Sequence, residues 1–537
     1  MPTKTLLIHN DNVSYDDFIH SIKFTLLDGD IDNSISSNII SKINSVDVDV
    51  IFIKDNLSSN YIELLGLRVA YHIRFSNELD TKKNIPIVII SDLDYFELSK
   101  LSKLSNMLFT KNIFLIPNTK SAIENILKKE FKHLTKDEYE KNFLNLIEIE
   151  PPKDYLSHHS ITNEWAIDQW AYFLNVQTKS VFKNREKISS MLYYKFLINQ
   201  YHLTNLYQNT NVKPKKYKGK ILLVDDKYKD GWADILESFC KMYYTNVEFN
   251  SFQKIDKDST IGQITKDLLK TINEFDPNII LLDLRLLESD TIKVDTKQNI
   301  NKLSGIEILS KIKNLYPAIQ IIMFTASSDS LILDELYNKW IIGYIKKDSP
   351  NIKYQTSKNS FKKLDSLIRK SLEKKYLKNI FEIQQKIQNL SLFQNQKDNK
   401  ILEILEIKNQ VFDILNSNIP KSFLYAMYAI FKSIELINNF YFKEQNINGK
   451  WCAVWRESGK TITGYSTEDR ILAILQKLQL EDEEMKKQLH YIVCSRNYNI
   501  HGGEEKSNCK DGLVKSPTEL HIEIWFETLY KILNKMK

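Results

Sequence analysis

Short apolar runs alternate with amphipathic stretches over residues 217–355, a pattern that predicts a doubly wound parallel sheet. The expected strands are 221–226, 246–249, 278–284, 319–325 and 343–347. Helical periodicity fills the intervals, at 231–243, 261–275, 305–315 and 331–339. Alternating strands and helices of this number and length indicate a flavodoxin-like α/β domain.

Residues 1–145 repeat this pattern more weakly. The strand-like segments TLLIHN, VDVIFIKDN, GLRVAYHIR, IPIVIIS and NIFLIP follow one another in the same order. The repeat predicts a second flavodoxin-like domain. Residues 146–216 are helix-like and rich in aromatic side chains, and we expect them to form a helical linker that ends at the polar stretch NVKPKKYKGK.

A different periodicity begins after Pro350. Apolar residues recur at helical spacing, which predicts a helical or coiled-coil linker over 356–400. They are Leu364, Ile368, Leu372, Leu377, Ile380, Ile383, Ile387 and Leu390. From 401 to 537 the pattern predicts a helical bundle, with an irregular insertion at 445–466. Its expected helices are 401–415, 421–443, 467–479, 482–500 and 517–535.

The composition is that of a folded, multidomain protein. The 537 residues are 42% hydrophobic and 26% charged, and a chain of this length exceeds what one core can organise. The N-terminus lacks the long apolar stretch of a signal peptide, and no apolar run approaches the ~20 residues of a membrane span. We therefore expect a cytoplasmic protein without membrane contact.

The net charge of +6 is unevenly distributed. Residues 351–400 carry 12 Lys and Arg against 4 Asp and Glu, a local charge of +8, whereas residues 401–537 carry 18 of each sign. A basic segment of this kind contacts a polyanion or is simply the solvated face of a helix, and the second interpretation is favoured.

Acidic side chains end two of the strands expected in 217–355. In a parallel sheet, side chains just past the carboxyl ends of the strands converge. Clustered carboxylates repel one another unless a cation neutralises them, and Mg²⁺ prefers a few carboxylates with water and a phosphoryl oxygen. A pocket formed by such side chains at the strand ends suits metal-assisted phosphoryl transfer to a carboxylate. Its expected members are Asp225, Asp226, Asp283, Thr325 and Lys347.

These residues resemble the receiver domain of two-component response regulators over essentially all of 217–355. The likeness rests on DD after the first strand, D after the third, TA after the fourth and GYxxK in the fifth. It implies that Asp283 is the phosphoacceptor and that Asp225 and Asp226 join it in binding Mg²⁺. The implied partner is a sensor histidine kinase or a phosphotransfer protein.

The resemblance also implies roles for the rest of the pocket. Lys347 would pair with the phosphoryl group, Thr325 would be the hydroxyl switch, and Tyr344 the aromatic residue that changes rotamer with it. Ala326 would leave room for the phosphoryl group. One departure from the family is the length of the loop after Asp283, because 21 residues separate Asp283 from Gly305.

The first copy of the pattern has lost this chemistry. With no carboxylate pair and a cation at the acceptor position, it should not bind Mg²⁺. We interpret 1–145 as a degenerate pseudo-receiver that serves dimerisation or partner docking. Asp55 would be an acceptor only if the register slipped by one residue. The counterparts are His9 and Asn10 for the acidic pair, Lys54 for the acceptor, Ser91 for Thr325, and Ile116 or Pro117 for Lys347.

The segment CSRNYNIHGG carries a second set of reactive groups. Arg496 precedes His501 by five positions, and the glycines that follow are helix terminators. Histidine exchanges a proton near neutral pH, and arginine binds a phosphate. Five positions on a helix are about 140° apart, so either the last turn distorts or a second chain completes the site.

This segment resembles the RxxxxH motif of HEPN domains, with Asn497 as the polar residue that often follows the arginine. Those domains are helical bundles, and many are metal-independent ribonucleases with a composite site at a dimer interface. The resemblance implies that Arg496, His501 and Asn497 are catalytic, that RNA is the substrate, that no cofactor serves the C-terminal domain and that the chain forms a homodimer.

Together the two resemblances imply a phosphorylation-controlled effector of a two-component-type system, with a ribonuclease gated by Asp283 and a role in stress response or antiviral defence against phage. The competing hypothesis is a non-catalytic scaffold. In that case the C-terminal bundle is a dimerisation or ligand-binding module, and the receiver gates assembly.

Overall fold

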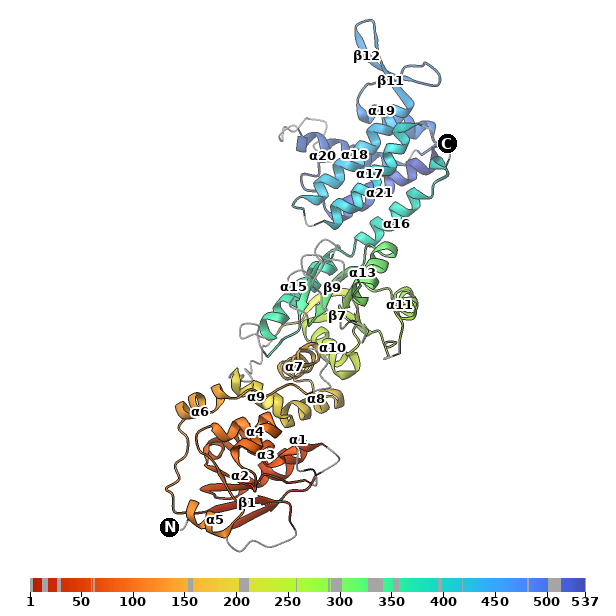
Figure 1. The fold of residues 1–537 in the computed structure, drawn as a ribbon. Helices are drawn as coiled ribbons and strands as arrows, with labels where there is room; N and C mark the ends of the chain where they lie inside the picture. The colour runs from red at the N-terminus through yellow and green to blue at the C-terminus, as the bar shows by residue number, and fades with distance from the viewer. Residues whose placement is uncertain are drawn as a thin grey trace.

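The computed structural model describes most of the chain, and the statements below concern the described residues. These are 3–11, 18–26, 30–58, 60, 63–152, 158–201, 212–256, 258–287, 290, 302–326, 341–350, 357–394, 398–417, 419–480, 482–500 and 513–536. Figure 1 shows an elongated molecule with three bodies in sequence order. An α/β domain lies at the N-terminal end, a second α/β domain in the middle, and a helical bundle at the other end.

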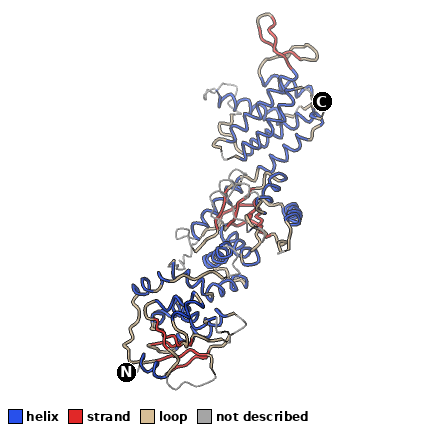
Figure 2. The backbone as a smooth tube through the Cα atoms, in the orientation of Figure 1, coloured by secondary structure: helices blue, strands red, loops and turns tan. Residues whose placement is uncertain are grey.

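The two α/β domains share one sheet topology. The first sheet has the order β2-β1-β3-β4-β5 and the second the order β10-β9-β8-β6-β7, which is the same 2-1-3-4-5 arrangement read from the opposite edge. Every strand pair in both sheets is parallel. This is the flavodoxin-like order predicted for both regions. Figure 2 shows the two sheets as separate groups of strands flanked by helices.

The first domain has short strands and short helices. Its strands are β1 (Thr5–His9), β2 (His20–Lys23), β3 (Val50–Lys54), β4 (Ile87–Ile90) and β5 (Ile113–Ile116). Its helices include α1 (Ile31–Ser34), α2 (Ser41–Ser45), α3 (Leu65–Phe75), α4 (Tyr95–Leu101), α5 (Lys120–Ile126) and α6 (Lys136–Asn142).

One strand expected in the first domain is wrong. The segment GLRVAYHIR belongs to helix α3, and β2 supplies the missing strand of the sheet. Helix α3 is buried almost all round, which hides the one-sided periodicity of a surface helix and leaves a continuous apolar run. Strand β2 has a single buried residue, Ile22, and therefore gave little apolar signal.

The second α/β domain matches its expected elements closely. Its strands are β6 (Lys215–Val224), β7 (Tyr244–Ser251), β8 (Ile279–Leu282), β9 (Gln320–Thr325) and β10 (Gly343–Lys346). Its helices include α10 (Trp232–Tyr243), α11 (Ile261–Phe275), α13 (Ser304–Leu315) and α15 (Ser357–Glu373). The helix expected over 331–339 lies outside the described residues.

The two expected linkers are not independent segments. Helices α7 (His158–Phe173), α8 (Lys179–Ser190) and α9 (Leu192–Gln200) fill the first one. Trp170 of α7 is part of the core of the second domain, whereas Tyr194 of α9 is part of the core of the first. These helices therefore join the two cores directly.

The basic segment 356–400 is divided in the same way. Helix α15 buries Phe361, Leu364 and Ile368 in the second domain, and α16 (Leu377–Gln388) buries its apolar residues in the bundle. The segment is helical, one of the two alternatives expected, and its continuous apolar periodicity faces two different cores. Lys362, Lys363 and Lys370 are exposed, as expected for a solvated helix face.

The bundle contains the five expected helices. They are α17 (Asn399–Asn416), α18 (Ser422–Tyr441), α19 (Thr467–Lys477), α20 (Glu483–Ile500) and α21 (Glu519–Lys535). The insertion is not irregular, because β11 (Phe442–Ile447) and β12 (Lys450–Trp455) form an antiparallel hairpin that projects from the bundle (Figure 1). Within the described ranges, every helix is too short or too polar to cross a membrane.

Candidate functional site

The carboxyl ends of β6 and β8 bring three carboxylates together. Asp225 and Asp226 follow β6 directly, and Asp283 follows β8. One oxygen atom of each lies within 4.8 Å of the others. Asp225 and Asp283 are buried and Asp226 is half-buried, so the cluster opens to solvent on the Asp226 side. The structure thus places together the acidic residues that the sequence predicted.

Lys347 lies inside this cluster. Its ammonium nitrogen donates to Asp225 Oδ2 at 2.8 Å and to Asp283 Oδ2 at 3.0 Å. The side chain is fully buried. The residue immediately follows β10, and its backbone N–H donates to the carbonyl of Thr325 at 2.8 Å, which fixes the lysine at the carboxyl edge of the sheet.

The charges in the pocket are not balanced. Burial raises the pKa of Asp283 to about 7, against the attraction of Lys347. Burial, followed by repulsion from Asp225, raises the pKa of Asp226 to about 6. Burial alone would lower the pKa of Lys347, but the carboxylates of Asp225 and Asp283 outweigh it and raise the pKa. A second ammonium, that of Lys227, lies 3.5 Å from Asp226 Oδ2, so two ammonium groups face three carboxylates and leave negative charge uncompensated.

This donor set fits Mg²⁺. The ion prefers oxygen ligands and retains water, and the pocket offers carboxylate oxygens of Asp225, Asp226 and Asp283 with a half-exposed side for water. A divalent cation would also supply the positive charge that Lys347 and Lys227 do not. The residues are therefore able to hold Mg²⁺ beside the Asp283 carboxylate.

The expected switch residues surround the same edge. Thr325 ends β9 and is buried, and Ala326 follows it. Tyr344 lies on β10 and is half-buried, and its ring lies 3.9 Å from the ammonium of Lys363 on α15. The tyrosine therefore contacts α15, the helix that continues toward the bundle.

Sequence reasoning missed Asp290, which bonds to residues at both ends of the loop after Asp283. Its buried carboxylate accepts hydrogen bonds from the backbone N–H groups of Leu286, Leu287 and Ser304, at 3.0, 3.1 and 3.1 Å. It also accepts one from the Ser304 hydroxyl. The two ends of the long loop are thus joined next to Asp283. A single aspartate in a polar loop has no periodic signal that would have revealed it.

Two glycines show which residue of the first domain corresponds to Asp283. A β-carbon added at Gly305 would lie 2.3 Å from the carbonyl oxygen of Asp283, and one added at Gly66 would lie 2.0 Å from that of Lys54. In each domain a helix start therefore packs against the backbone at the carboxyl end of the third strand in sheet order, at Lys54, the last residue of β3, and at Asp283, the residue after β8. Lys54 occupies the position of Asp283, as the sequence comparison expected.

The strand register identifies the other counterparts in the first domain. His9 ends β1 and Asn10 follows it, at the positions where the acidic pair follows β6, and burial lowers the pKa of His9. When the pairing of neighbouring strands is followed across each sheet, Leu115 of β5 corresponds to Tyr344 of β10. Lys347 comes three residues after Tyr344, so its equivalent is Asn118, three residues after Leu115. The expected Ile116 or Pro117 is wrong. The apolar run at the end of β5 gave no marker of the register.

The acceptor position of the first domain holds an ion pair. The ammonium of Lys54 contacts the carboxylate of Asp11, and both side chains are partly exposed. Asp55, the next residue, accepts a hydrogen bond from the Ser91 hydroxyl. A cation thus stands where the second domain has its buried Asp283, and the described part of this domain has no cluster of three metal-ligating side chains.

The C-terminal motif is only partly described. Arg496 lies in the last turn of α20, and its guanidinium carbon is 4.8 Å from the centre of the Phe431 ring on α18. Its Nη1 donates to Asn497 Oδ1 at 3.0 Å. Burial raises the pKa of the neighbouring Tyr428, and the charge of Arg496 opposes the shift. His501 lies outside the described residues.

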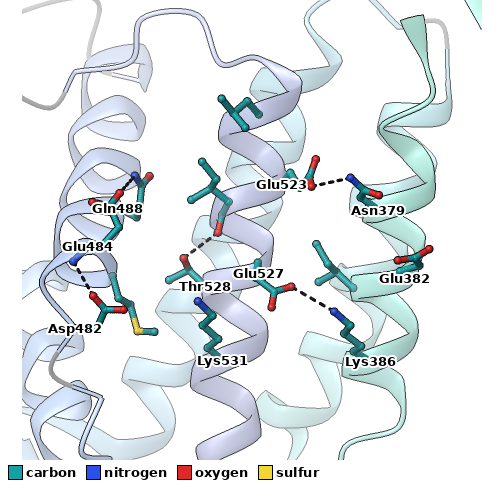
Figure 3. Close-up of a pocket in the computed structure, with 14 residues that line it drawn as sticks. Asn379, Glu382, Lys386, Asp482, Glu484, Gln488, Glu523, Glu527, Thr528 and Lys531 are labelled. Atoms are coloured by element: carbon teal, nitrogen blue, oxygen red, sulfur yellow. Dashed lines mark hydrogen bonds and ion pairs between the residues drawn. The ribbon is translucent and has the colours of Figure 1, made fainter. Parts of the chain in front are cut away.

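A cavity of about 390 Å³ lies elsewhere in the bundle, between α16, α20 and α21 (Figure 3). Glu523 accepts a hydrogen bond from Asn379 at 2.8 Å, and Glu527 lies 3.9 Å from Lys386. The lining is rich in carboxylates, which repel a phosphate, and it uses the opposite end of α20 from Arg496. These carboxylates are Glu382, Asp482, Glu484, Glu523 and Glu527.

One region of the chain matches a known protein family. Residues 3–116 match the family model of the inactive receiver domain. The match covers the five strands of the first sheet and agrees with the loss of the acidic residues there. The interpretation of the N-terminal domain as a degenerate receiver is therefore confirmed. The search of curated proteins finds no match.

Solved structures with some likeness include receiver proteins. The signal receiver domain of a protein described as a Luxo repressor, from Vibrio parahaemolyticus, is 18% identical, with a TM-score of 0.21, over 31% of this chain and 98% of that one. A LuxR-family response regulator from Aurantimonas sp. is 19% identical, with a TM-score of 0.18, over 27% and 86%. NtrX from Brucella abortus, in complex with ADP, is 16% identical, with a TM-score of 0.23, over 36% and 34%. Likeness at this level carries no conclusion about activity.

Proposed function

We propose that the second α/β domain is a working receiver, phosphorylated at Asp283, and that the chain is an effector of a two-component-type system. The observation that carries the proposal is the buried Lys347 ammonium between Asp225 and Asp283, with Asp226 beside them. A fully buried lysine shared by two carboxylates is costly to build for stability alone. It is well suited to hold a phosphoryl group that is added to one of them.

In the transfer step, a carboxylate oxygen of Asp283 attacks the phosphorus of a phosphohistidine on a sensor histidine kinase or a phosphotransfer protein. The O–P bond forms as the P–N bond breaks, and the departing imidazole nitrogen takes up a proton. Lys347 donates to an oxygen of the transferred group. Mg²⁺ bound by Asp225, Asp226 and Asp283 supplies further positive charge.

The switch residues complete the receiver. The Thr325 hydroxyl is near the new phosphoryl oxygens because the residue ends the strand beside Lys347. Movement of Thr325 frees space for the Tyr344 ring. Because that ring contacts Lys363 of α15, the change passes to the helix that leads into the bundle.

We further propose that the bundle is a HEPN-type ribonuclease in a homodimer. The 2′-hydroxyl oxygen of RNA attacks the adjacent phosphorus, and the bond from phosphorus to the 5′-oxygen breaks. His501 takes the proton from the 2′-hydroxyl and returns it to the leaving oxygen, while Arg496 binds the phosphate and Asn497 orients the guanidinium. The hydrogen bond from Arg496 to Asn497 and the aromatic surface of Phe431 beneath the guanidinium support this arrangement.

One experiment tests both parts. The purified full chain is incubated with Mg²⁺ and a small phosphoryl donor, and then with total RNA, alongside samples that lack the donor. We expect one acid-stable, base-labile phosphate per chain, and RNA products that end in 2′,3′-cyclic phosphate. His501→Ala should lower the cleavage rate by ~10² to 10⁴, the usual contribution of a general acid or base.

A matched control separates phosphate binding from charge. Arg496→Lys keeps the positive charge but loses the planar fork, so it should restore little activity relative to Arg496→Ala. Undiminished cleavage by His501→Ala would refute the catalytic assignment. The scaffold hypothesis is favoured by a specific feature, the carboxylate-rich cavity, which repels RNA. Absence of cleavage in both phosphorylation states would support it.

A further inference from the structure

Helix α7 precedes the second α/β domain in sequence but packs beside its acidic pocket. Trp170 is fully buried in the core of that domain, and its ring lies 5.4 Å from the ring of Trp232 and 5.7 Å from that of Phe324. Trp232 begins α10 and Phe324 lies on β9. Figure 1 shows α7 next to α10.

Trp170 also bonds to the residue that follows Lys347. Its indole N–H donates to Asp348 Oδ2 at 3.0 Å, and Asp348 is buried. The same carboxylate accepts hydrogen bonds from Ser357 at 2.7 Å and from Ser360 at 2.8 Å, both at the start of α15. Asp348 therefore attaches the end of β10 to α7 on one side and to α15 on the other.

A second contact between α7 and the pocket passes through Trp232. Its indole N–H donates to Asn163 Oδ1 of α7 at 3.2 Å. The ammonium of Lys347 lies 5.3 Å from the centre of the Trp232 ring and 4.9 Å from that of Phe324. These two aromatic faces are the apolar walls that surround the lysine. Helix α7 thus bonds to one of the walls and to the backbone neighbour of the lysine.

We propose that Trp170 is a positioning residue for Lys347, so that docking of α7 and phosphorylation of Asp283 are coupled. The inference rests on the proposed receiver function and adds a helix from outside the domain to its machinery. When the lysine turns from two carboxylates to a phosphoryl group, the end of β10 and the Trp232 ring must adjust. Both are bonded to α7. Because coupling is reciprocal, the docked helix in turn affects how readily the pocket accepts the group.

The other end of this helical segment is fixed to the first domain. Tyr194 of α9 donates to Glu164 of α7 at 2.6 Å. The backbone N–H of Leu192, at the start of α9, donates to Asp32 Oδ2 of the first domain at 2.9 Å. A shift of α7 is therefore passed to the degenerate receiver, which gives that domain a place in the response.

The test compares two identical substitutions in one helix of the full chain. Trp170→Phe keeps a ring and removes the indole N–H. Trp165→Phe makes the same change at a buried position of α7 that belongs to the core of the first domain. We expect Trp170→Phe to slow phosphorylation by a small donor about 2- to 10-fold, the effect of one hydrogen bond, and Trp165→Phe to leave the rate unchanged. Asp348→Asn should act in the same direction as Trp170→Phe.

A second readout distinguishes coupling from loss of stability. Hydrogen exchange of the α7 amides is measured with and without beryllofluoride and Mg²⁺. We expect beryllofluoride to change the exchange rate of α7 several-fold in the wild-type chain, and Trp170→Phe to reduce that response while the melting temperature stays close to that of Trp165→Phe. Equal phosphorylation rates in both variants, or α7 exchange that ignores beryllofluoride, would overturn the inference alone. No phosphate uptake by the wild-type chain would overturn the receiver assignment with it.

Discussion

The two α/β domains have one sheet topology and opposite pocket chemistry. Both sheets have the same order, and in both a glycine at a helix start packs against one residue at the carboxyl end of the third strand in sheet order. That residue is Asp283 in one domain and Lys54 in the other. The second domain buries a lysine between carboxylates, whereas the first keeps a half-exposed ion pair. The two domains thus keep the same backbone arrangement around the site, and a few residues at the strand ends decide its chemistry.

Loss of the acceptor should have the largest effect. Asp283→Ala is expected to abolish Mg²⁺-dependent phosphate uptake by the full chain, because the first domain has no acidic pair to replace it. Mass spectrometry of the intact chain after treatment with a small phosphoryl donor measures this. Wild-type labelling in the Asp283→Ala chain would show that another carboxylate is the acceptor, and labelling at Asp55 would show that the two domains do not differ as argued.

The paired glycines test the structural equivalence directly. Gly66→Ala and Gly305→Ala should each destabilise their own domain by up to about 3 kcal/mol, because the new β-carbon meets a backbone carbonyl that a side-chain rotation does not relieve. Gly305→Ala should in addition slow phosphorylation, since the carbonyl it displaces is that of Asp283. Denaturant unfolding followed by probes in each domain measures the first effect. Gly262→Ala, where nothing lies within 4 Å, is the matched control.

The sequence predicted the second domain well because each of its parts has a local signal. Strands β8 and β9 are continuous buried runs, and Asp283 comes directly after β8. The first domain was harder to predict. Helix α3 is buried almost all round, so its sequence pattern is that of a strand, and β2 is an edge strand with one buried residue.

Long-range contacts explain what the sequence did not predict. Asp348 and Trp170 are 178 positions apart, and neither belongs to a recognisable motif. The apolar stripe of 356–400 is continuous in sequence but contributes to two cores, so its periodicity alone indicates a helical or coiled-coil linker and not the division between them. The catalytic assignment of the C-terminal motif remains a prediction, because the structure describes Arg496 and not His501.

The loop after Asp283 is a further feature that distinguishes the second domain from the first. Asp290→Asn is expected to destabilise the second domain by about 1–2 kcal/mol, because an amide accepts fewer of the four hydrogen bonds that now reach the buried carboxylate. Phosphorylation should slow but persist, since the pocket residues are intact. Asp256→Asn, at an exposed position of the same domain, is the control. Equal stability of the two variants would show that the loop ends are held by other contacts.

The smallest effect is expected in the pocket of the first domain. Lys54→Met removes the contact with Asp11, and because both side chains are partly exposed, the stability of the domain should change by only ~0–1 kcal/mol. Lys54→Asp goes further and places a carboxylate at the acceptor position. In a chain that also carries Asp283→Ala, Lys54→Asp should still take up no phosphate, because His9 and Asn10 stand where the second domain has its acidic pair and Asn118 stands where it has Lys347. Phosphate found on residue 54 would mean that a single carboxylate restores the chemistry, and the contrast between the domains would then rest on that one position.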